Sequence, residues 1–266
     1  MRTTSPKPSM GVLHLDEGEK KFRLTRHSPS PELGYFVKHF WIVSWDLTGQ
    51  QPYLQDVVPN PCVNMVVERG RTAIFGPAKG KYSYLVKDKG CVFGVKFKPG
   101  GFYPFIRQPV SALSNKPMNV LDVFGIAAKE LERTLLALPD ESSMVAQADR
   151  LMRAKLPDRD DNVALVNRII DHVQANMTIA KVDQLCDLFH LNKRTLQRLF
   201  DQYVGVSPKW VIQLYRIHNA AEALDKDRAI DRLQLSYDLG YYDQSHFIKD
   251  FKTIIGVTPE EYAKRQ

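Results

Sequence analysis

Apolar residues recur at helical spacing in the C-terminal part of the chain, most clearly in NKRTLQRLFDQYVGVSP (192–208). Leu196, Leu199 and Phe200 lie at positions i, i+3 and i+4, which predicts a helix with one apolar face. Basic and amide side chains occupy the opposite face, and Arg and Gln have the forked donors that read base edges. Gly205 breaks this helix, and the Ser-Pro pair after it is typical of a new helix start.

The same pattern returns in DQSHFIKDFKTIIGVTP (243–259). Aligning Gly205 with Gly256 gives an offset of 256 − 205 = 51 residues. At this offset the matching pairs are Asn192 with Asp243, Leu196 with Phe247, Arg198 with Lys249, Phe200 with Phe251, Asp187 with Asp238, and Leu188 with Leu239. A repeat of this length indicates one supersecondary unit used twice. A short helix, a tight turn and the amphipathic helix give each unit the layout of a helix-turn-helix.

A helix from Pro208 to Leu224 is predicted to join the two units. Its length is roughly 25 Å at ~1.5 Å per residue. Adjacent major-groove faces on one side of DNA lie ~34 Å apart. This helix, together with the widths of the units, therefore sets the two amphipathic helices about one turn of DNA apart.

The N-terminal half alternates with the period of β-strands. One strand is predicted over 35–47, with one face formed by Val37, His39, Trp41, Val43, Trp45 and Leu47. Residues 82–86 and 91–98 are predicted to form a hairpin around Asp88-Lys89-Gly90. In its second strand, Cys91, Phe93, Val95 and Phe97 face inward, and Lys96 and Lys98 face outward. Two helices follow, over 128–138 and 141–155.

These patterns predict an α+β chain with two domains. Residues 1–157 are expected to form a β-rich small barrel or sandwich with trailing helices. A short charged linker, Pro157–Asp161, ends this domain. Residues 163–266 are expected to form an all-α domain of two helix-turn-helix units joined by the long helix.

Composition limits the function classes. The chain has 266 residues, of which 44% are hydrophobic and 25% charged, which is ordinary for a soluble globular protein. It has no run of ~20 apolar residues that would span a membrane. The N-terminus has no signal-peptide core, which favours the cytoplasm. Cys62, Cys91 and Cys186 form no CxxC pair, so neither a metal ion nor a cofactor is expected.

The net charge of +7 makes the chain a candidate for binding polyanions. Residues 163–266 hold 14 Lys and Arg and 13 Asp and Glu, so they contribute only 14 − 13 = +1. The case for nucleic acid there depends on the local placement of bases on one helix face. The basic stretch 69–121 is read as a solvated sheet face in preference to a surface for an acidic ligand or DNA backbone.

The C-terminal part resembles the DNA-binding domain of the AraC/XylS family of bacterial transcription regulators. The stretches that carry the resemblance are RTLQRLFDQYVGVSPKWVIQLYRIHNA and DLGYYDQSHFIKDFKTIIGVTPEEY. It implies that the second helix of each unit enters a major groove. The matching positions are Asn192, Lys193, Arg194, Gln197, Arg198, Gln244, Ser245, His246 and Lys249. Two positions depart from the family pattern. His190 stands at a turn position that is commonly Gly, where a left-handed backbone is needed. Lys249 stands where Arg is common, which weakens bidentate guanine reading.

The N-terminal half resembles the β-rich regulatory domain of some members of this family, through HFWIVSWDL, PNPCVNMVVE and VFGVKFKPGGFYPF. The implied function is sequence-specific transcription regulation, with effector sensing or dimerisation by this domain. The implied partners are double-stranded DNA at two adjacent major-groove sites, a small-molecule effector, RNA polymerase and a second copy of the chain. No membrane partner is expected, and the sequence does not distinguish an activator from a repressor.

Several alternatives stay open from the residues alone. Asn192 and Asp243 are favoured as N-caps over base readers. For His246, base reading, capping of its helix and pairing with a phosphate all stay open. Trp41, Trp45 and Tyr53 are favoured as core residues over the lining of an effector pocket. A second hypothesis makes the N-terminal half a ligand-binding domain and the helical half a module for protein contacts. It predicts that the protein shows no salt-sensitive DNA binding.

Enzymatic readings are disfavoured, and no catalytic residue is predicted. The loop from Gly76 to Lys81 is one residue too short for a phosphate loop, and Tyr82 replaces the hydroxyl that follows such a loop. His39 and Cys62 are a conceivable nucleophile pair, but nothing in the sequence brings them together.

Overall fold

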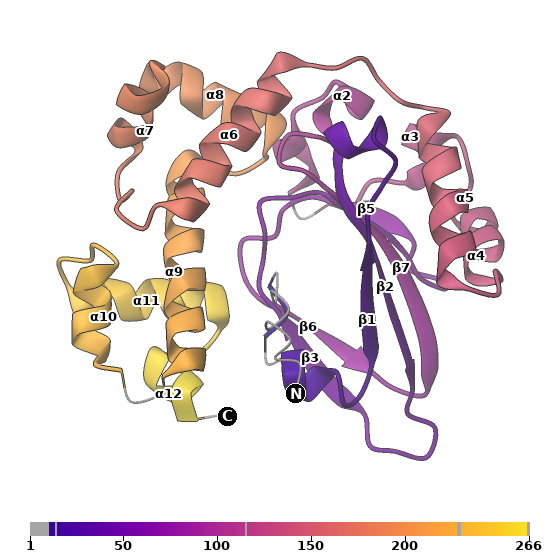
Figure 1. The fold of residues 1–266 in the computed structure, drawn as a ribbon, viewed down its shortest axis with the longest axis horizontal. Coiled ribbons are helices and arrows are strands. Elements are labelled where there is room, and N and C mark those ends of the chain that lie inside the picture. Colours follow the sequence, from indigo (N-terminus) through magenta and orange to yellow (C-terminus); the bar gives the residue numbers. More distant parts are fainter. Residues whose placement is uncertain (1–10, 14, 115, 228–229, 265–266) are drawn as a thin grey trace, which may run out of the picture.

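The computed structural model describes residues 11–13, 15–114, 116–227 and 230–264. Its N-terminal part is built on a five-stranded antiparallel sheet of order β1-β2-β7-β4-β5 (Figure 1). The strands are β1 (Arg23–His27), β2 (Val37–Asp46), β4 (Asn64–Val67), β5 (Ala73–Phe75) and β7 (Lys89–Phe97). A second sheet pairs β3 (Tyr53–Val57) with β6 (Tyr82–Val86). The α+β class is confirmed. Among the described strands the larger sheet stays open, so the barrel alternative does not hold.

Helices cover one face of the larger sheet. Figure 1 shows α4 (Ala128–Leu136) and α5 (Glu141–Arg153) on the side away from the C-terminal helices. Beneath them, Phe40, Phe93 and Val95 are completely buried. The smaller elements are α1 (Leu15–Gly18), η1 (Leu33–Tyr35), α2 (Tyr103–Ile106), η2 (Val110–Leu113) and α3 (Val120–Phe124).

The strand β2 carries a register shift that the alternating pattern did not predict. Val37 pairs with Phe97, and His39 pairs with Lys96, so one extra residue is inserted between the two pairs. A bulge of this kind moves the following side chains to the other face. Val37 therefore lies in the helix-covered core with Phe40, whereas His39 lies on the opposite face.

Two further predictions for this region are wrong. The strands β6 and β7 do not form a hairpin, because β6 pairs with β3 while β7 pairs with β2 and β4. Lys96 was expected to face solvent, yet it is only 8% exposed. The reason is that its sheet face looks toward the C-terminal helices, and the side chain lies near the Cys62 thiol of the preceding loop and His218 of the longest C-terminal helix.

The C-terminal part is all helical and contains two clusters of buried residues. The first unit consists of α6 (Asp161–Ala175), α7 (Val182–Phe189) and α8 (Lys193–Tyr203). The second consists of α10 (Arg232–Asp238), α11 (Gln244–Ile255) and α12 (Pro259–Lys264). The helix α9 (Pro208–Lys226) contributes to both clusters and joins them, as the apolar spacing predicts.

The predicted linker lies between the end of α5 and the start of α6, and we propose to divide the chain into its two domains there. Several contacts cross this boundary. The Tyr35 hydroxyl donates to the backbone oxygen of Asp160 (2.7 Å), and the amide of Asn167 donates to the backbone oxygen of Pro99 (2.9 Å). The centres of the Tyr103 and Tyr203 rings lie 4.2 Å apart. Among the described residues, no helix is long and apolar enough to cross a membrane.

Candidate nucleic-acid interface

The outward helix of the first unit, α8, begins at a side-chain cap. The Asn192 side chain accepts a hydrogen bond from the Thr195 backbone N–H (2.8 Å), which satisfies one of the free N–H groups at the helix start. Leu196 and Phe200 are completely buried on the inner face. The apolar spacing thus holds the polar face of α8 toward solvent.

That polar face presents three of the predicted reading residues, Arg194, Gln197 and Arg198, all exposed. None of them has a hydrogen bond or ion pair with another described residue. Lys193 differs, because its ammonium pairs with Asp183 of α7 at 2.8 Å. This bond raises the pKa of Lys193, but it also holds the ammonium beside α7. Arg194, Gln197 and Arg198 are therefore the groups of this helix that are free to take an external partner.

The second unit repeats the arrangement on α11. The Asp243 side chain accepts from the Ser245 backbone N–H (2.8 Å) and also pairs with Nδ1 of His246 at 3.0 Å. Backbone donation from Ser245 lowers the pKa of Asp243. Gln244, Ser245 and Lys249 are exposed, whereas Phe247 and Phe251 are completely buried. Asn192 and Asp243 are thus both N-caps, as favoured from the sequence.

The turns between the two helices of each unit differ in length. In the first unit His190 adopts the predicted left-handed backbone (φ 53°) two residues before the cap. In the second unit Gly240 takes this conformation (φ 76°) three residues before the cap. The short helices therefore correspond at an offset of 240 − 190 = 50 residues. The predicted pairing of Asp187 with Asp238 and of Leu188 with Leu239 is wrong by one residue.

The extra residue in the second turn is Tyr242. It is 90% exposed, the most exposed large hydrophobic side chain of the described residues. The uniform offset of 51 hid this insertion, because Gly, Pro and cap positions after the turn do match at 51. The appearance of Gly240 three residues before Asp243, where His190 stands two before Asn192, is the signal in the sequence that identifies it.

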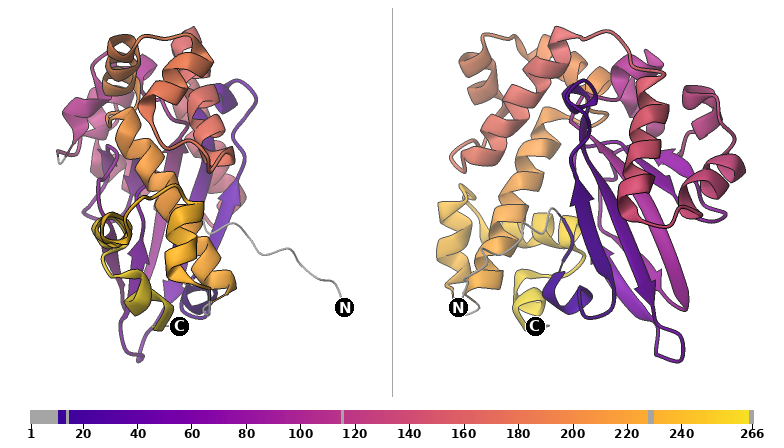
Figure 2. Two further views of the ribbon diagram at one scale, coloured as in Figure 1. Left: turned by 90° about the vertical axis from the view of Figure 1, so that its left-hand side faces the viewer. Right: turned by 45° about the vertical axis from the view of Figure 1, so that its right-hand side comes forward.

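Both outward helices have their C-terminal ends against the N-terminal domain. A Cβ on Gly205, which follows α8, would lie 2.9 Å from Val110 Cγ1, and one on Gly256, which follows α11, would lie 2.9 Å from Lys81 Cε. Their N-terminal ends therefore point away from the sheet, on one side of the molecule, as Figures 1 and 2 show. The N-terminal ends carry the exposed polar residues, so these residues face the same direction.

The helix α9 holds the second unit through the side chain of Arg216. The Arg216 side chain donates through Nε to the backbone oxygen of Leu239 (2.6 Å), and its guanidinium lies 3.7 Å from the centre of the Tyr241 ring. A Cβ on Gly240 would come within 3.6 Å of the Ala180 Cβ in the first unit. The two units are therefore in contact with each other as well as with α9.

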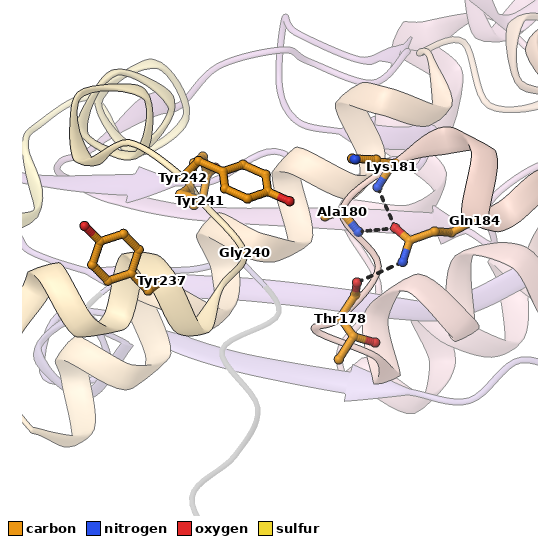
Figure 3. Close-up of a pocket in the computed structure, with 8 residues that line it drawn as sticks. All are labelled: Thr178, Ala180, Lys181, Gln184, Tyr237, Gly240, Tyr241 and Tyr242. Atoms are coloured by element: carbon orange, nitrogen blue, oxygen red, sulfur yellow. Dashed lines mark hydrogen bonds between the residues drawn. The ribbon is translucent and has the colours of Figure 1, made fainter.

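A cleft of about 530 Å³ opens where the two units meet (Figure 3). Its first-unit wall is held by Gln184, whose side-chain oxygen accepts from the backbone N–H groups of Ala180 (2.9 Å) and Lys181 (2.8 Å). The second-unit wall carries the tyrosines Tyr237, Tyr241 and Tyr242. The exposed groups Lys181 and Tyr242 border this cleft, and the sequence analysis named neither.

The residues considered for catalysis do not form a reactive site. Cys62 is buried, and burial raises the pKa of its thiol, which favours the unreactive protonated form. His39 is also buried, and burial together with the nearby cations Lys96, Arg26 and Lys38 lowers its pKa to about 3. The part of the chain that the structure describes contains no group of three or more His, Cys, Asp or Glu side chains able to hold a metal ion.

Two helix-turn-helix units with capped, exposed outward helices define a nucleic-acid-binding module of the helix-turn-helix class. Residues 185–265 match the family model described as a helix-turn-helix domain, and residues 25–119 match a model described as a domain of unknown function. The C-terminal domain is therefore a helix-turn-helix domain, of the type found in AraC-type regulators.

Three known proteins are each similar to less than half of this chain. An uncharacterised HTH-type transcriptional regulator of Haemophilus influenzae is 29% identical over 31% of this chain and 28% of its own length. The F1 operon positive regulatory protein of Yersinia pestis is 31% identical over 36% of this chain and 33% of its own length. A probable AraC family regulator from Rhodopseudomonas palustris is 21% identical over 40% of this chain and 97% of that chain, with a TM-score of 0.35. The chain thus covers about a third of the two curated relatives.

Proposed function

We propose that this protein is a transcription regulator that binds double-stranded DNA with α8 and α11 in adjacent major grooves. The observation that carries the proposal is the shared direction of the two N-terminal helix ends. Each end presents exposed polar side chains from a helix whose inner face is buried. Chain segments that bind base edges need this combination of a fixed backbone and free side chains.

The proposed contacts fall into two kinds. Arg194, Gln197 and Arg198 on α8, and Gln244 on α11, are proposed to read bases, because guanidinium and amide groups match the acceptors and donors of guanine and adenine. Ser245, His246 and Lys249 are proposed to contact phosphates, and Lys193 to do so when its ammonium exchanges Asp183 for a phosphate. Such contacts position the protein without reading sequence. Asn192 is proposed to support DNA binding indirectly, because its side chain caps α8 and holds the start of that helix in place.

The cleft between the units is proposed to border the DNA backbone between the two grooves. Tyr242 directly precedes the cap of α11, and Lys181 precedes α7 on the opposite wall. A phenol hydroxyl and an ammonium are both donors to phosphate oxygens. Their removal is expected to weaken binding to all fragments to a similar extent.

The decisive experiment compares Arg198→Ala with wild type on fragments that the purified protein enriches from a genomic library. The variant is expected to lose about 1–3 kcal/mol on the preferred fragment, with a smaller loss on unrelated DNA. Lys129→Ala is the matched control, because Lys129 is an exposed base on α4, on the other side of the sheet. Equal affinity of Arg198→Ala and wild type for every fragment, at one salt concentration, would remove α8 from the interface.

The N-terminal domain is proposed to regulate DNA binding. In support, it touches the end of α8 through Val110 and the end of α11 through Lys81, which is held by Asp56 at 2.6 Å. A conformational change in this domain would therefore act directly on the C-terminal ends of α8 and α11. An effector, a second copy of the chain and RNA polymerase are the proposed partners of this regulation.

A further inference from the structure

A loop of the N-terminal domain closes over one end of α11. It connects β5 to β6 and has the sequence Gly-Pro-Ala-Lys-Gly-Lys over residues 76–81. A Cβ on Gly80 would lie 3.5 Å from the backbone oxygen of Thr253 in α11. One on Gly256, the C-cap of this helix, would lie 2.9 Å from Cε of Lys81. The loop therefore continues the surface of α11 past the end of the helix.

The part of α11 that meets the loop belongs to the outward face. Residues at i, i+4 and i+7 lie in one stripe along a helix. In α11 this stripe consists of Ser245, Lys249 and Lys252, all exposed, and the C-cap Gly256 follows at i+11. Since Lys81 lies against Gly256, the loop covers the end of the same stripe that carries the proposed DNA contacts.

The lysines of this stripe and of the loop form one basic surface. Lys249, Lys252 and Lys79 are exposed, and none of their ammonium groups pairs with another described residue. The acid in contact with the loop is Asp56, and its carboxylate is already held by the Lys81 ammonium at 2.6 Å. This pair fixes the loop in place and leaves the three exposed lysines as the charges that an external anion meets.

The first unit has the opposite charge at the matching position. Asp201 of α8 corresponds to Lys252 at the offset of 252 − 201 = 51 residues, and it is exposed. The outward face of α8 is thus basic at its start and acidic at its end. On α11 the basic character extends to the end of the helix, where the loop adds Lys79.

The length of α11 places this end beside the DNA backbone. The helix has 12 residues, or roughly 18 Å at ~1.5 Å per residue, whereas the major groove is ~12 Å wide. In helix-turn-helix proteins the N-terminal residues of the outward helix contact the base edges. A helix placed in this way passes over the phosphates at the edge of the groove with its C-terminal turn. The loop over residues 76–81 reaches the same edge.

We propose that this loop of the N-terminal domain is part of the DNA interface, and that Lys79 binds a phosphate at the edge of the groove that α11 occupies. Lys81 is a positioning residue, because its pair with Asp56 holds the loop against Gly256. The inference rests on the proposed DNA-binding function. It gives the N-terminal domain a direct share in DNA affinity, so displacing the loop would weaken binding even if α11 did not move.

The test measures the affinity of the full chain for DNA fragments over a series of salt concentrations, by fluorescence anisotropy. Lys79→Gln removes one phosphate contact, so the slope of log affinity against log salt is expected to become shallower by about 0.9. At about 0.1 M salt the affinity is expected to fall by a factor of roughly 8. The loss should be equal on an enriched fragment and on unrelated DNA, because a phosphate contact reads no bases.

Lys87→Gln is the matched control. Lys87 is an exposed lysine at the opposite end of β6 from the loop, so this variant makes the same change of charge away from α11 and is expected to bind as the wild type does. Lys79→Arg keeps the cation and is expected to retain the wild-type slope.

The loop proposal and the proposed function fail in different ways. A wild-type chain without salt-sensitive binding would contradict the DNA-binding function itself. Wild-type binding together with an unchanged slope and affinity in Lys79→Gln would contradict only the part assigned to the loop. Tighter binding by Lys79→Gln would also overturn that part, because the loop would then obstruct the DNA. An equal loss in Lys87→Gln would mean that net charge, and not the place of Lys79, sets the affinity.

Discussion

At the scale of single residues, His39 shows how the bulge in β2 changes a side chain's chemistry. The inserted residue puts His39 beside Lys96 on the face toward α9, where it is 9% exposed. Burial and the cations Lys96, Arg26 and Lys38 then lower its pKa from 6.5 to about 3. His218, lowered to about 4 by burial and by Lys96, behaves in the same way. Both imidazoles are therefore neutral in the folded protein at neutral pH.

This lowering makes stability depend on pH in a defined window. Between pH 6.5 and about 3 the unfolded chain binds a proton at His39 that the folded chain does not. Stability is therefore expected to fall as the pH is lowered through this window, by at most ~1.4 kcal/mol per pH unit for each such group. His39→Gln should unfold with a shallower pH dependence than wild type, and His218 contributes part of the slope that remains.

The measurement is the unfolding temperature at fixed ionic strength across that range. His190→Gln is the matched control, because it makes the same substitution at an exposed imidazole. Identical slopes for His39→Gln and wild type would mean that His39 takes up its proton in the folded state as readily as in the unfolded chain.

At the scale of elements, local signals predicted the C-terminal helices well. Asn192, Ser207 and Asp243 were expected to begin helices, and each accepts a backbone hydrogen bond as an N-cap. These signals act within one helical turn, so the sequence contains them directly. The extra residue at Tyr242 was missed because a single offset of 51 was applied throughout. Positions after the turn match at 51, whereas positions before it match at 50.

The N-terminal strands were predicted less well, because strand pairing joins residues that are distant in the chain. The turn at Asp88 was recognised, but it does not indicate that β6 pairs with β3. The burial of Lys96 depends on α9, more than a hundred residues later in the chain, so alternation along β7 predicts only its side of the sheet. The sequence therefore gives no sign that Lys96 is buried beside other cations.

The cap of α8 yields a prediction that separates its structural role from DNA contact. Asn192→Ala removes the acceptor for the Thr195 N–H and is expected to reduce the free energy of unfolding by ~1 kcal/mol. Asn192→Asp keeps a capping oxygen and is expected to retain stability. It also adds a negative charge at the start of α8, which is expected to weaken DNA binding most strongly at low salt.

Urea unfolding and fluorescence anisotropy with one DNA fragment measure the two effects separately. Gln50→Glu, in the exposed loop between β2 and β3, is the control for the added charge and is expected to bind DNA as wild type does. Wild-type affinity in Asn192→Asp would place the N-terminal end of α8 away from the phosphates.

At the scale of the whole molecule, the two units behave as one body. They share α9, meet at Ala180 and Gly240, and each rests against the N-terminal domain through the residue after its outward helix. Two helix-turn-helix units on a flexible tether would adapt to different spacings along DNA. Units held at three places cannot adapt, because any rotation of one would break contacts with α9, its neighbour and the sheet domain together.

This rigidity predicts how affinity depends on the distance between the two half-sites in an enriched fragment. Inserting about 5 base pairs, half a turn, puts the half-sites on opposite faces, and inserting about 10 restores the face but doubles the separation. Both insertions are expected to reduce affinity to that of a fragment with one half-site, whereas the same insertion outside the site should have no effect. Anisotropy titrations on the series measure this, with Arg198→Ala and Lys249→Ala identifying which half-site each unit occupies. Recovery of affinity at the full-turn insertion would show that the contacts at Gly205, Gly240 and Gly256 release in solution, and the two units would then have to be treated as independent readers.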